Sequence, residues 1–157
     1  MIEDWIDALC ERWAFSDERF GTVRSYKLVG ETSFPDSIDP ADLAMSPIAL
    51  TIPAGMDVEY SEGGVRLGFY SGVTEFHVAP DLNRSRIPQL MPWYGRILEA
   101  AAGKMQLGVA GVEYFVIDRE NGIQGPLSLQ YGSEAQHWGF LVRWTVKERL
   151  NNLTVSR

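Results

Sequence analysis

Side chains that commonly carry out chemistry are few in this sequence. It contains two histidines, His77 and His137, about sixty residues apart, each beside aromatic or apolar residues in or next to a predicted strand. A histidine in such a setting usually packs against its neighbours, so we expect neither to be catalytic. Zinc sites need three or four clustered Cys, His or carboxylate ligands, and the chain has neither a CxxC nor an HExxH pattern. We therefore expect no metal and no cofactor.

Carboxylates could act as general acid and general base without a recognisable motif. Five of them lie on or beside predicted strands, at Asp57, Glu59, Glu75, Glu113 and Asp118. Their spacing singles out no catalytic pair, so a solvated face is the favoured interpretation. The sequence also lacks the fingerprints of a phosphate-binding loop, a nucleophile elbow and a dinucleotide-binding fold. We expect no enzymatic activity.

Four cations lie in and around one predicted helix: Arg84, Arg86, Arg96 and Lys104. Together with Trp93 and Tyr94 they could bind nucleic acid through phosphate contacts and base stacking. The net charge is −7, however, and general nucleic-acid binding requires a surplus of cations. One of the two aromatic residues is also expected on the buried side of the helix. We expect no specific nucleic-acid binding and favour a contact between these cations and the acidic N-terminal part of a neighbouring copy.

The charges are unevenly distributed along the chain. Residues 1–62 contain thirteen acidic and four basic side chains, whereas residues 63–157 contain eight acidic and ten basic ones. The acidic part could simply keep the protein soluble. Alternatively, copies of the chain could stack or form rings with opposite potentials facing each other, because complementary fields set orientation and register.

The stretch HWGFLVRWTVKERL, residues 137–150, alternates as a half-buried strand requires. The side that we expect to face the core carries Trp138, Phe140, Val142, Trp144 and Val146. The opposite side carries Arg143 and Lys147. We expect the first side to be the surface on which helices pack and the second side to contact other subunits.

Two helices are predicted from the spacing of apolar residues. The first stripe consists of Ile2, Trp5, Ile6, Leu9, Cys10 and Trp13. Its two indoles indicate that this helix docks on a sheet. The second helix begins near Pro88 or Pro92 and ends near Gly103, where a glycine commonly stops a helix. Its predicted apolar stripe consists of Leu90, Tyr94, Ile97, Leu98 and Ala101.

The remaining regular segments are rich in β-forming residues. Strands are predicted at 22–29, 48–52, 56–60, 65–70, 73–79, 107–118, 126–131 and 137–148. Residues 61–64 suit a hairpin turn, Gly68 and Gly72 suggest a bulge or bend, and short connections predict that the strands of the last third are antiparallel neighbours. The order of elements predicts a single α+β domain over residues 1–157, with a mainly antiparallel β-sheet and two α-helices packed on one face.

Residues 30–47 differ in character from the rest of the chain. They contain Pro35, Pro40 and Pro47 and few large apolar residues, together with the acids Asp36, Asp39 and Asp42. Loops of this length in compact domains are usually functional or disordered. We expect a long, partly flexible loop that becomes ordered on a partner.

The composition is that of an ordinary globular protein. A chain of 157 residues with 45% hydrophobic and 22% charged residues is long enough for one domain with a substantial core. No apolar run approaches the length of a membrane span, and the acidic, amphipathic N-terminus differs from a secretory signal. We expect folding in a cytosol-like compartment and no membrane partner. The single Cys10 cannot form an internal disulfide.

The whole chain has a characteristic order of segments. An amphipathic helix is followed by SPIALTIP, TEFHVA, WYGRILEAAAGK, VEYFVID and a closing WGFLVRWTVKERL. This order and its hydrophobic rhythm resemble the tail terminator proteins of long-tailed, lambda-like phages. The resemblance implies a non-enzymatic structural subunit that forms a ring, six-fold in the family, which caps the tail tube and joins it to the head.

The resemblance also implies partners and a location. The partners would be further copies of the chain, the tail tube protein and the head completion or connector protein. The location would be the head-proximal end of the virion tail, with assembly in the host cytoplasm. On this interpretation the candidate interface residues are Arg84, Arg86, Arg96, Arg143, Lys147, Asp36, Asp39 and Asp42.

Two alternatives remain open at this point. Another phage head-tail connector or neck protein could have the same size and pattern, with different partners. A small-molecule-binding or catalytic α+β domain could instead use Trp138, Trp144 or Tyr114 to line a pocket, since ligand sites are usually aromatic-lined concavities.

Overall fold

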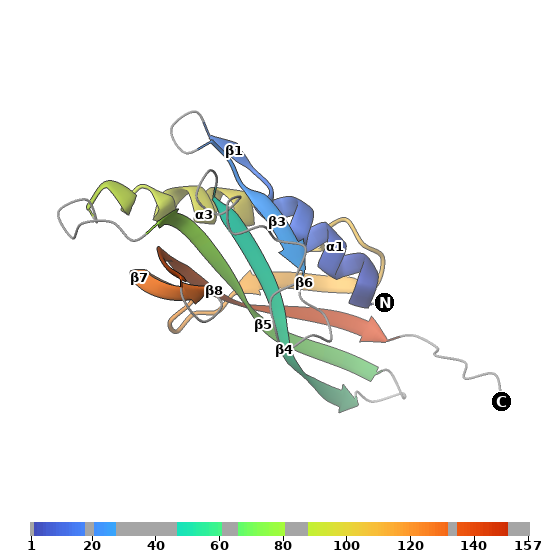
Figure 1. Ribbon diagram of the computed structural model, residues 1–157. Coiled ribbons are helices and arrows are strands. Elements are labelled where there is room, and N and C mark those ends of the chain that lie inside the picture. The colour runs from blue at the N-terminus through green and yellow to red at the C-terminus, as the bar shows by residue number, and fades with distance from the viewer. Residues whose placement is uncertain are drawn as a thin grey trace.

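The N-terminal helix packs one side of its surface against the sheet. The computed structural model describes residues 2–17, 21–27, 47–60, 66–80, 88–131 and 135–150, and Figure 1 shows their arrangement. Helix α1 (Ile2–Trp13) buries Trp5, Ile6, Leu9 and Trp13 and leaves Cys10 half-buried. The predicted apolar stripe is confirmed at these positions.

One sheet of six strands forms the centre of the molecule. In spatial order its strands are β3 (Arg24–Lys27), β4 (Ile48–Tyr60), β5 (Arg66–Pro80), β8 (Ala135–Leu150) and β6 (Val112–Ile117), and β7 (Ile123–Tyr131) also pairs with β8. β3 is parallel to β4, and the other described pairings in this sheet are antiparallel. β1 (Ser16–Asp17) and β2 (Gly21–Thr22) form a separate antiparallel pair.

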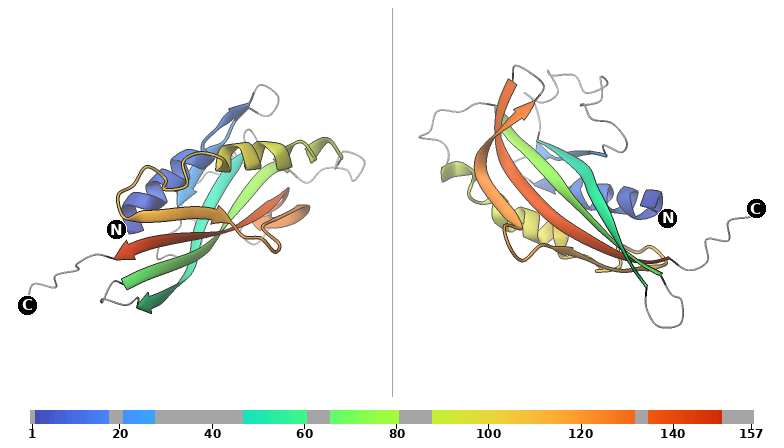
Figure 2. Two further views of the ribbon diagram at one scale, coloured as in Figure 1. Left: turned by 180° about the vertical axis from the view of Figure 1, so that it is seen from behind. Right: turned by 90° about the horizontal axis from the view of Figure 1, so that it is seen from below.

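Both helices cover the same face of the sheet. Figure 2 shows α1 and α3 (Trp93–Ala101) together on one side, with the long strands on the other. The predicted α+β fold, with a mainly antiparallel sheet and two helices on one face, is therefore confirmed. The term outer face is used below for the face of the sheet that points away from these helices.

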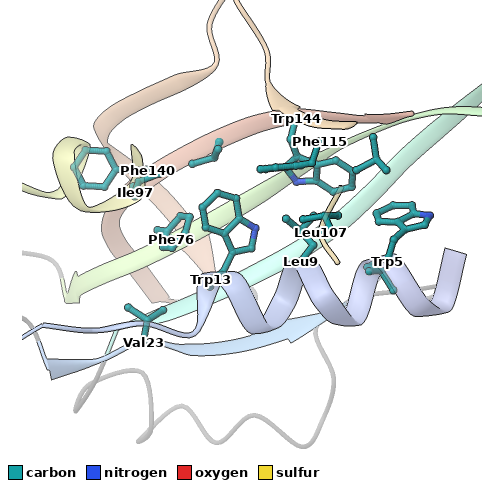
Figure 3. Packing of buried hydrophobic residues seen from close by; sticks show 14 of the residues in the cluster. Trp5, Leu9, Trp13, Val23, Phe76, Ile97, Leu107, Phe115, Phe140 and Trp144 are labelled. Carbon is teal, nitrogen blue, oxygen red and sulfur yellow. The ribbon is translucent and has the colours of Figure 1, made fainter. Parts of the chain in front are cut away.

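The core lies between the helices and the sheet, and β8 contributes most to its floor. Phe140, Val142, Trp144 and Val146 are fully buried and alternate with more exposed residues, as the sequence predicts. Figure 3 shows indoles from α1 meeting the rings of the sheet. Trp5 approaches Trp144 edge to face with centroids 5.7 Å apart, and Trp13 approaches Phe76 at 5.3 Å. Aromatic pairs of this geometry add stability beyond the area that they bury.

The indole of Trp144 occupies a space that a glycine leaves open. A Cβ atom on Gly72, which lies opposite Trp144, would be 2.4 Å from the indole ring and 2.8 Å from the backbone oxygen of Ile52. The indole N–H of Trp144 donates to Thr74 Oγ1 at 3.0 Å, and the hydroxyls of Thr74 and Thr51 are 3.1 Å apart. A buried polar chain thus links β8, β5 and β4, and the polar atoms that it buries are satisfied.

The last third of the chain differs from the predicted meander. The prediction that successive strands pair with each other is wrong for β6 and β7, because both pair with β8 along the same edge. The chain leaves this edge at Asp118 and returns at Gly122, and the backbone of Arg143 closes the excursion with bonds to both residues, at 2.9 and 2.8 Å. Asn121 has a φ of 53°, a left-handed conformation that asparagine tolerates.

Other predicted elements have shifted boundaries. The strand predicted at 107–118 begins only at Val112, because Leu107, Gly108 and Gly111 have left-handed φ values of 56°, 70° and 90°. The segments 48–52 and 56–60 form one continuous strand, β4. The pairing of β4 with β5 is irregular between Pro53 and Gly55, opposite the predicted Gly72, and the pairing of β5 with β8 is irregular between His77 and Ala79.

The second helix buries or packs against the core most of its predicted apolar stripe, including Tyr94 and Ala101, with Leu98 as the exception. α3 buries Trp93 and Ile97, and Leu90 in the short turn before it is also buried. Leu98, which the sequence stripe included, is 53% exposed. The reason is that Trp93, with its larger apolar surface, faces the sheet and so turns Leu98 outward. The predicted loop at 30–47 lies outside the described residues except for Pro47, as does the predicted hairpin turn at 61–64.

Substitution of Gly72 tests the packing of Trp144. We expect Gly72→Ala to lower the free energy of unfolding by about 1–3 kcal/mol, because the new methyl group overlaps the indole and the Ile52 backbone. Gly55→Ala is the matched control, since no atom lies within 4 Å of its added Cβ. Urea unfolding followed by tryptophan fluorescence measures both variants, and an equal effect of the two would contradict the proposed packing.

Candidate functional site

The outer face of β8 carries the cations that the sequence assigns to subunit contact. Lys147 lies between two aromatic residues because Phe69 on β5 and Tyr114 on β6 are its direct neighbours across the strands. Its ammonium group is 5.5 Å from the Phe69 ring centre and 5.7 Å from that of Tyr114. It also contacts Glu113 at 2.8 Å, and Arg149 contacts the same carboxylate at 3.5 Å.

These contacts shift the pKa values of Glu113 and Lys147. The hydrogen bond from Lys147 lowers the pKa of Glu113, and the charge of Arg149 acts in the same direction. The hydrogen bond to Glu113 in turn raises the pKa of Lys147. Lys147 is therefore held within an ion-pair and aromatic cluster, and its contact with other subunits stays a prediction.

Arg143 differs from Lys147 in its environment. Its side chain is exposed on the outer face, while its backbone closes the excursion between β6 and β7. In the described part of the chain, no hydrogen bond or ion pair of its guanidinium group is found. Arg143 thus retains the properties of a contact residue that the sequence assigned to both cations.

The other predicted interface residues do not join this group. Arg96 lies on α3, on the opposite side of the sheet, where its guanidinium contacts Glu99 at 3.0 Å. The predicted interface residues Arg84, Arg86, Asp36, Asp39 and Asp42 lie outside the described residues. The structure therefore separates Arg96 from Arg143 and Lys147.

Sequence reasoning missed a pair of facing histidines. The pairing of β5 with β8 brings the rings of His77 and His137 to 5.6 Å between centroids, and His77 Nε2 lies 3.0 Å from a carboxylate oxygen of Glu75. Both histidines are buried, with exposed fractions of 2% and 8%. Burial, and secondly the charge of His77, lower the pKa of His137. Residues sixty apart in sequence give no signal of this contact until the strand register is known.

This histidine pair has limited chemical capacity. Two imidazoles and a carboxylate can exchange a proton, but general acid-base catalysis also requires a substrate within hydrogen-bond reach. Among residues 2–17, 21–27, 47–60, 66–80, 88–131 and 135–150, no group of three or more His, Cys, Asp or Glu side chains is placed to hold a metal ion. The pair is therefore best described as a buried polar contact of the outer face.

A second buried polar contact lies on the helix side of the sheet. Burial, followed by the charge of Glu148 and a hydrogen bond to it, raises the pKa of Tyr70 to about 12. Tyr70 therefore remains a neutral phenol, and its ring lies 4.9 Å from that of Trp5. This arrangement stabilises the end of the core and provides no open reaction site.

One hollow on the surface is smaller than a usual ligand pocket, and Trp144 lines no pocket because it lies in the core. A hollow of about 200 Å³ lies between β1 and α3, lined by Phe15, Ser16, Arg96, Glu99 and Ala100. Ligand pockets usually measure about 300–1,000 Å³. Trp144, one of the aromatic residues considered for a pocket wall, is a fully buried core residue.

None of the helices in the described part of the chain is long and apolar enough to cross a membrane.

Two apolar surfaces are exposed on different elements. The arm surface consists of Met56, Val58 and Tyr60, on the half of β4 that extends beyond β3. The α3 surface consists of Met91, Leu98 and Met105, on and around the helix. The residues of the arm surface share one side of the same strand, and exposed apolar residues that gather in this way mark interaction sites more often than residues scattered singly.

Comparison with models of known protein families and with curated proteins finds no match to this chain.

The buried histidine pair predicts a dependence of stability on pH. Because the folded state lowers the pKa of His137 from its ordinary value of 6.5, the unfolded chain binds the proton first as pH falls. We expect the stability to be retained above about pH 6.5 and to decline as pH falls towards the folded-state pKa. His137→Gln should reduce this decline between pH 7 and 5, as measured by urea unfolding at each pH. Parallel curves for the two proteins would contradict the assignment.

The two cations of the outer face should differ in their effect on stability. We expect Arg143→Glu to change the free energy of unfolding by less than about 0.5 kcal/mol, since exposed substitutions cost little. Lys147→Glu should lower the urea midpoint clearly, because it places a carboxylate beside Glu113 and removes both aromatic contacts. Lys147→Gln serves as the charge-neutral comparison. Equal midpoints for Arg143→Glu and Lys147→Glu would show that the cluster around Lys147 contributes nothing.

Proposed function

We propose that this chain is a structural subunit of a phage tail, a tail terminator-like protein that forms a ring, caps the tail tube and joins it to the head connector. The order of elements along the sequence supports this proposal through its resemblance to that family. The structural observation that carries it is the α3 surface, because Leu98 on α3, Met91 just before the helix and Met105 just after it are large apolar side chains that are 50–54% exposed. Exposed apolar residues concentrated in one segment favour a contact with another protein.

The ring geometry makes specific demands on such a subunit. A cyclic assembly uses a heterologous interface, in which two different patches on each subunit match. The α3 surface supplies one apolar patch, and the same segment of the chain also carries the cations Arg96 and Lys104. The uneven distribution of charge along the chain supplies the opposite sign for a second patch, since residues 1–62 are strongly acidic.

The remaining surfaces suit the partners above and below a ring. The outer face presents Arg143, which is exposed on a rigid central strand. A rigid, solvated face that carries an unengaged cation can meet the tail tube protein or the head completion protein without a change in the fold. The proposed role requires binding surfaces and no reaction centre.

The capping activity can be measured directly with polymerising tail tube protein. We expect the wild-type chain to stop elongation, so that tubes become shorter as its concentration rises, and to form rings visible by native mass spectrometry. Leu98→Asp should weaken both effects while changing the free energy of unfolding by less than about 0.5 kcal/mol, because Leu98 is exposed in the isolated subunit.

A matched control uses another partly exposed apolar residue. Val58→Asp on β4 introduces the same charge at a position that is 44% exposed and belongs to the arm surface instead of the α3 surface, and it should leave capping intact. Tubes that reach their normal length at saturating wild-type protein would refute the proposed function. Normal rings from Leu98→Asp would instead remove only the α3 surface from the contact.

A further inference from the structure

The far half of β4 is an open sheet edge. β3 pairs only with Ile48–Thr51 of β4, and in the described residues no strand pairs with Gly55–Tyr60 on the side away from β5. Figure 1 shows this part of β4 extending past the end of β3 and away from α1. Every residue from Ala54 to Tyr60 is exposed. An edge of this kind carries unpaired backbone N–H and C=O groups, to which another extended chain can bind.

The geometry of this edge is regular over its whole length. The register with β5 runs without interruption from the pair Gly55 and Ser71 to the pair Tyr60 and Arg66. The bulge lies before this segment, between Pro53 and Gly55. Six residues in regular register span about 20 Å, which is the length of a typical strand. The edge is therefore long enough to hold one added strand.

The side chains of the edge alternate in chemistry. Met56, Val58 and Tyr60 point to the helix side, and Tyr60 is 69% exposed. Asp57 and Glu59 point to the outer face. A strand added to this edge places its own alternate residues beside these two rows. The complementary strand would have apolar residues on one side and cations on the other.

The same acids disfavour pairing of the edge with a second copy of itself. An antiparallel pairing centred on Val58 would place Asp57 directly opposite Glu59 at both ends of the pair. Like charges directly opposite each other in a sheet are destabilising, and charged residues on edge strands are a common protection against self-association. Charge repulsion thus disfavours pairing of this edge with its own copy, and the same acids favour pairing with a basic strand.

We propose that the β4 edge, Gly55–Tyr60, binds an extended segment of a partner protein in which basic and apolar residues alternate. Backbone hydrogen bonds to the edge would provide the affinity, and the acidic and apolar rows would select the sequence. The site is separate from the α3 surface, and it goes beyond the proposed ring function because it defines the chemistry of a different partner.

Synthetic peptides and the full-length chain can test this site. The probe is an acetylated six-residue peptide of alternating Lys and Val, titrated into ¹⁵N-labelled protein. We expect amide shifts confined to Gly55–Tyr60 and slower hydrogen exchange at alternate amides of this segment. A peptide of alternating Glu and Val should bind about tenfold more weakly, since two cross-strand charge pairs change sign.

Two controls separate strand addition from nonspecific attraction. A peptide with the same composition in two blocks, three Lys followed by three Val, lacks the alternation and should bind at least about tenfold more weakly. The variant Asp57→Lys with Glu59→Lys should reverse the preference between the Lys and Glu peptides, whereas Glu11→Lys with Glu120→Lys, at exposed positions elsewhere, should not.

Three outcomes would overturn the proposal. They are shifts that spread over the surface instead of the edge, equal binding of the alternating and block peptides, and self-association of the wild-type chain through the same amides. Retained urea stability of the Asp57 and Glu59 variant is expected, because both residues are exposed, and its measurement excludes unfolding as the cause of lost binding.

Discussion

The fold depends on the packing of one indole into one gap in the sheet. Trp144 lies over Gly72, donates its N–H to Thr74 and meets Trp5 of α1 edge to face. These contacts join the two central strands, the neighbouring β4 and the first helix at a single point, and Figure 3 shows Trp144 and Trp5 among the other buried residues of the core. Because interiors are packed as densely as organic crystals, an indole in such a place fixes the register of the strands beside it. The residues beside the indole suit the space that it leaves: a glycine at position 72 and a small hydrogen-bonding residue at position 74.

The two faces of the sheet have different roles as a result. On the helix side, aromatic packing fills the space between the sheet and the helices α1 and α3. This packing does not reach the arm surface of β4. The outer face is satisfied locally by small groups of side chains, such as Lys147 with Glu113 and His77 with Glu75. Exposed groups without an intramolecular partner in the described residues lie at the periphery, and they include the free edge of β4, Leu98 on α3 and the side chain of Arg143. The candidate contacts are therefore those that the core does not use.

The sequence was a good guide to features that depend on local spacing. The buried side of α1 and the alternation of β8 follow from periods of 3.6 and 2, and both were predictable. Most of the buried side of α3 was predictable as well, but the outward position of Leu98 was not, because packing against the sheet decides which residue at the margin of the stripe is buried. The contact between His77 and His137 and the shared edge of β6 and β7 depend on register across the sheet, which no local pattern encodes. For the candidate contacts, the exposure of Arg143 was predictable, whereas the cluster around Lys147 required the neighbours from two other strands.

The position of β8 has a consequence for the time course of folding. It is the last described strand along the chain, yet it pairs with β5, β6 and β7, and its pairs with β5 join residues such as Arg66 and Leu150. Contacts between residues so far apart in sequence form slowly, since a long loop must close before they are gained. During synthesis the three earlier strands have no central partner until residues 135–150 have emerged. The pairings at the centre of the sheet can therefore form only after residues 135–150 have been synthesised.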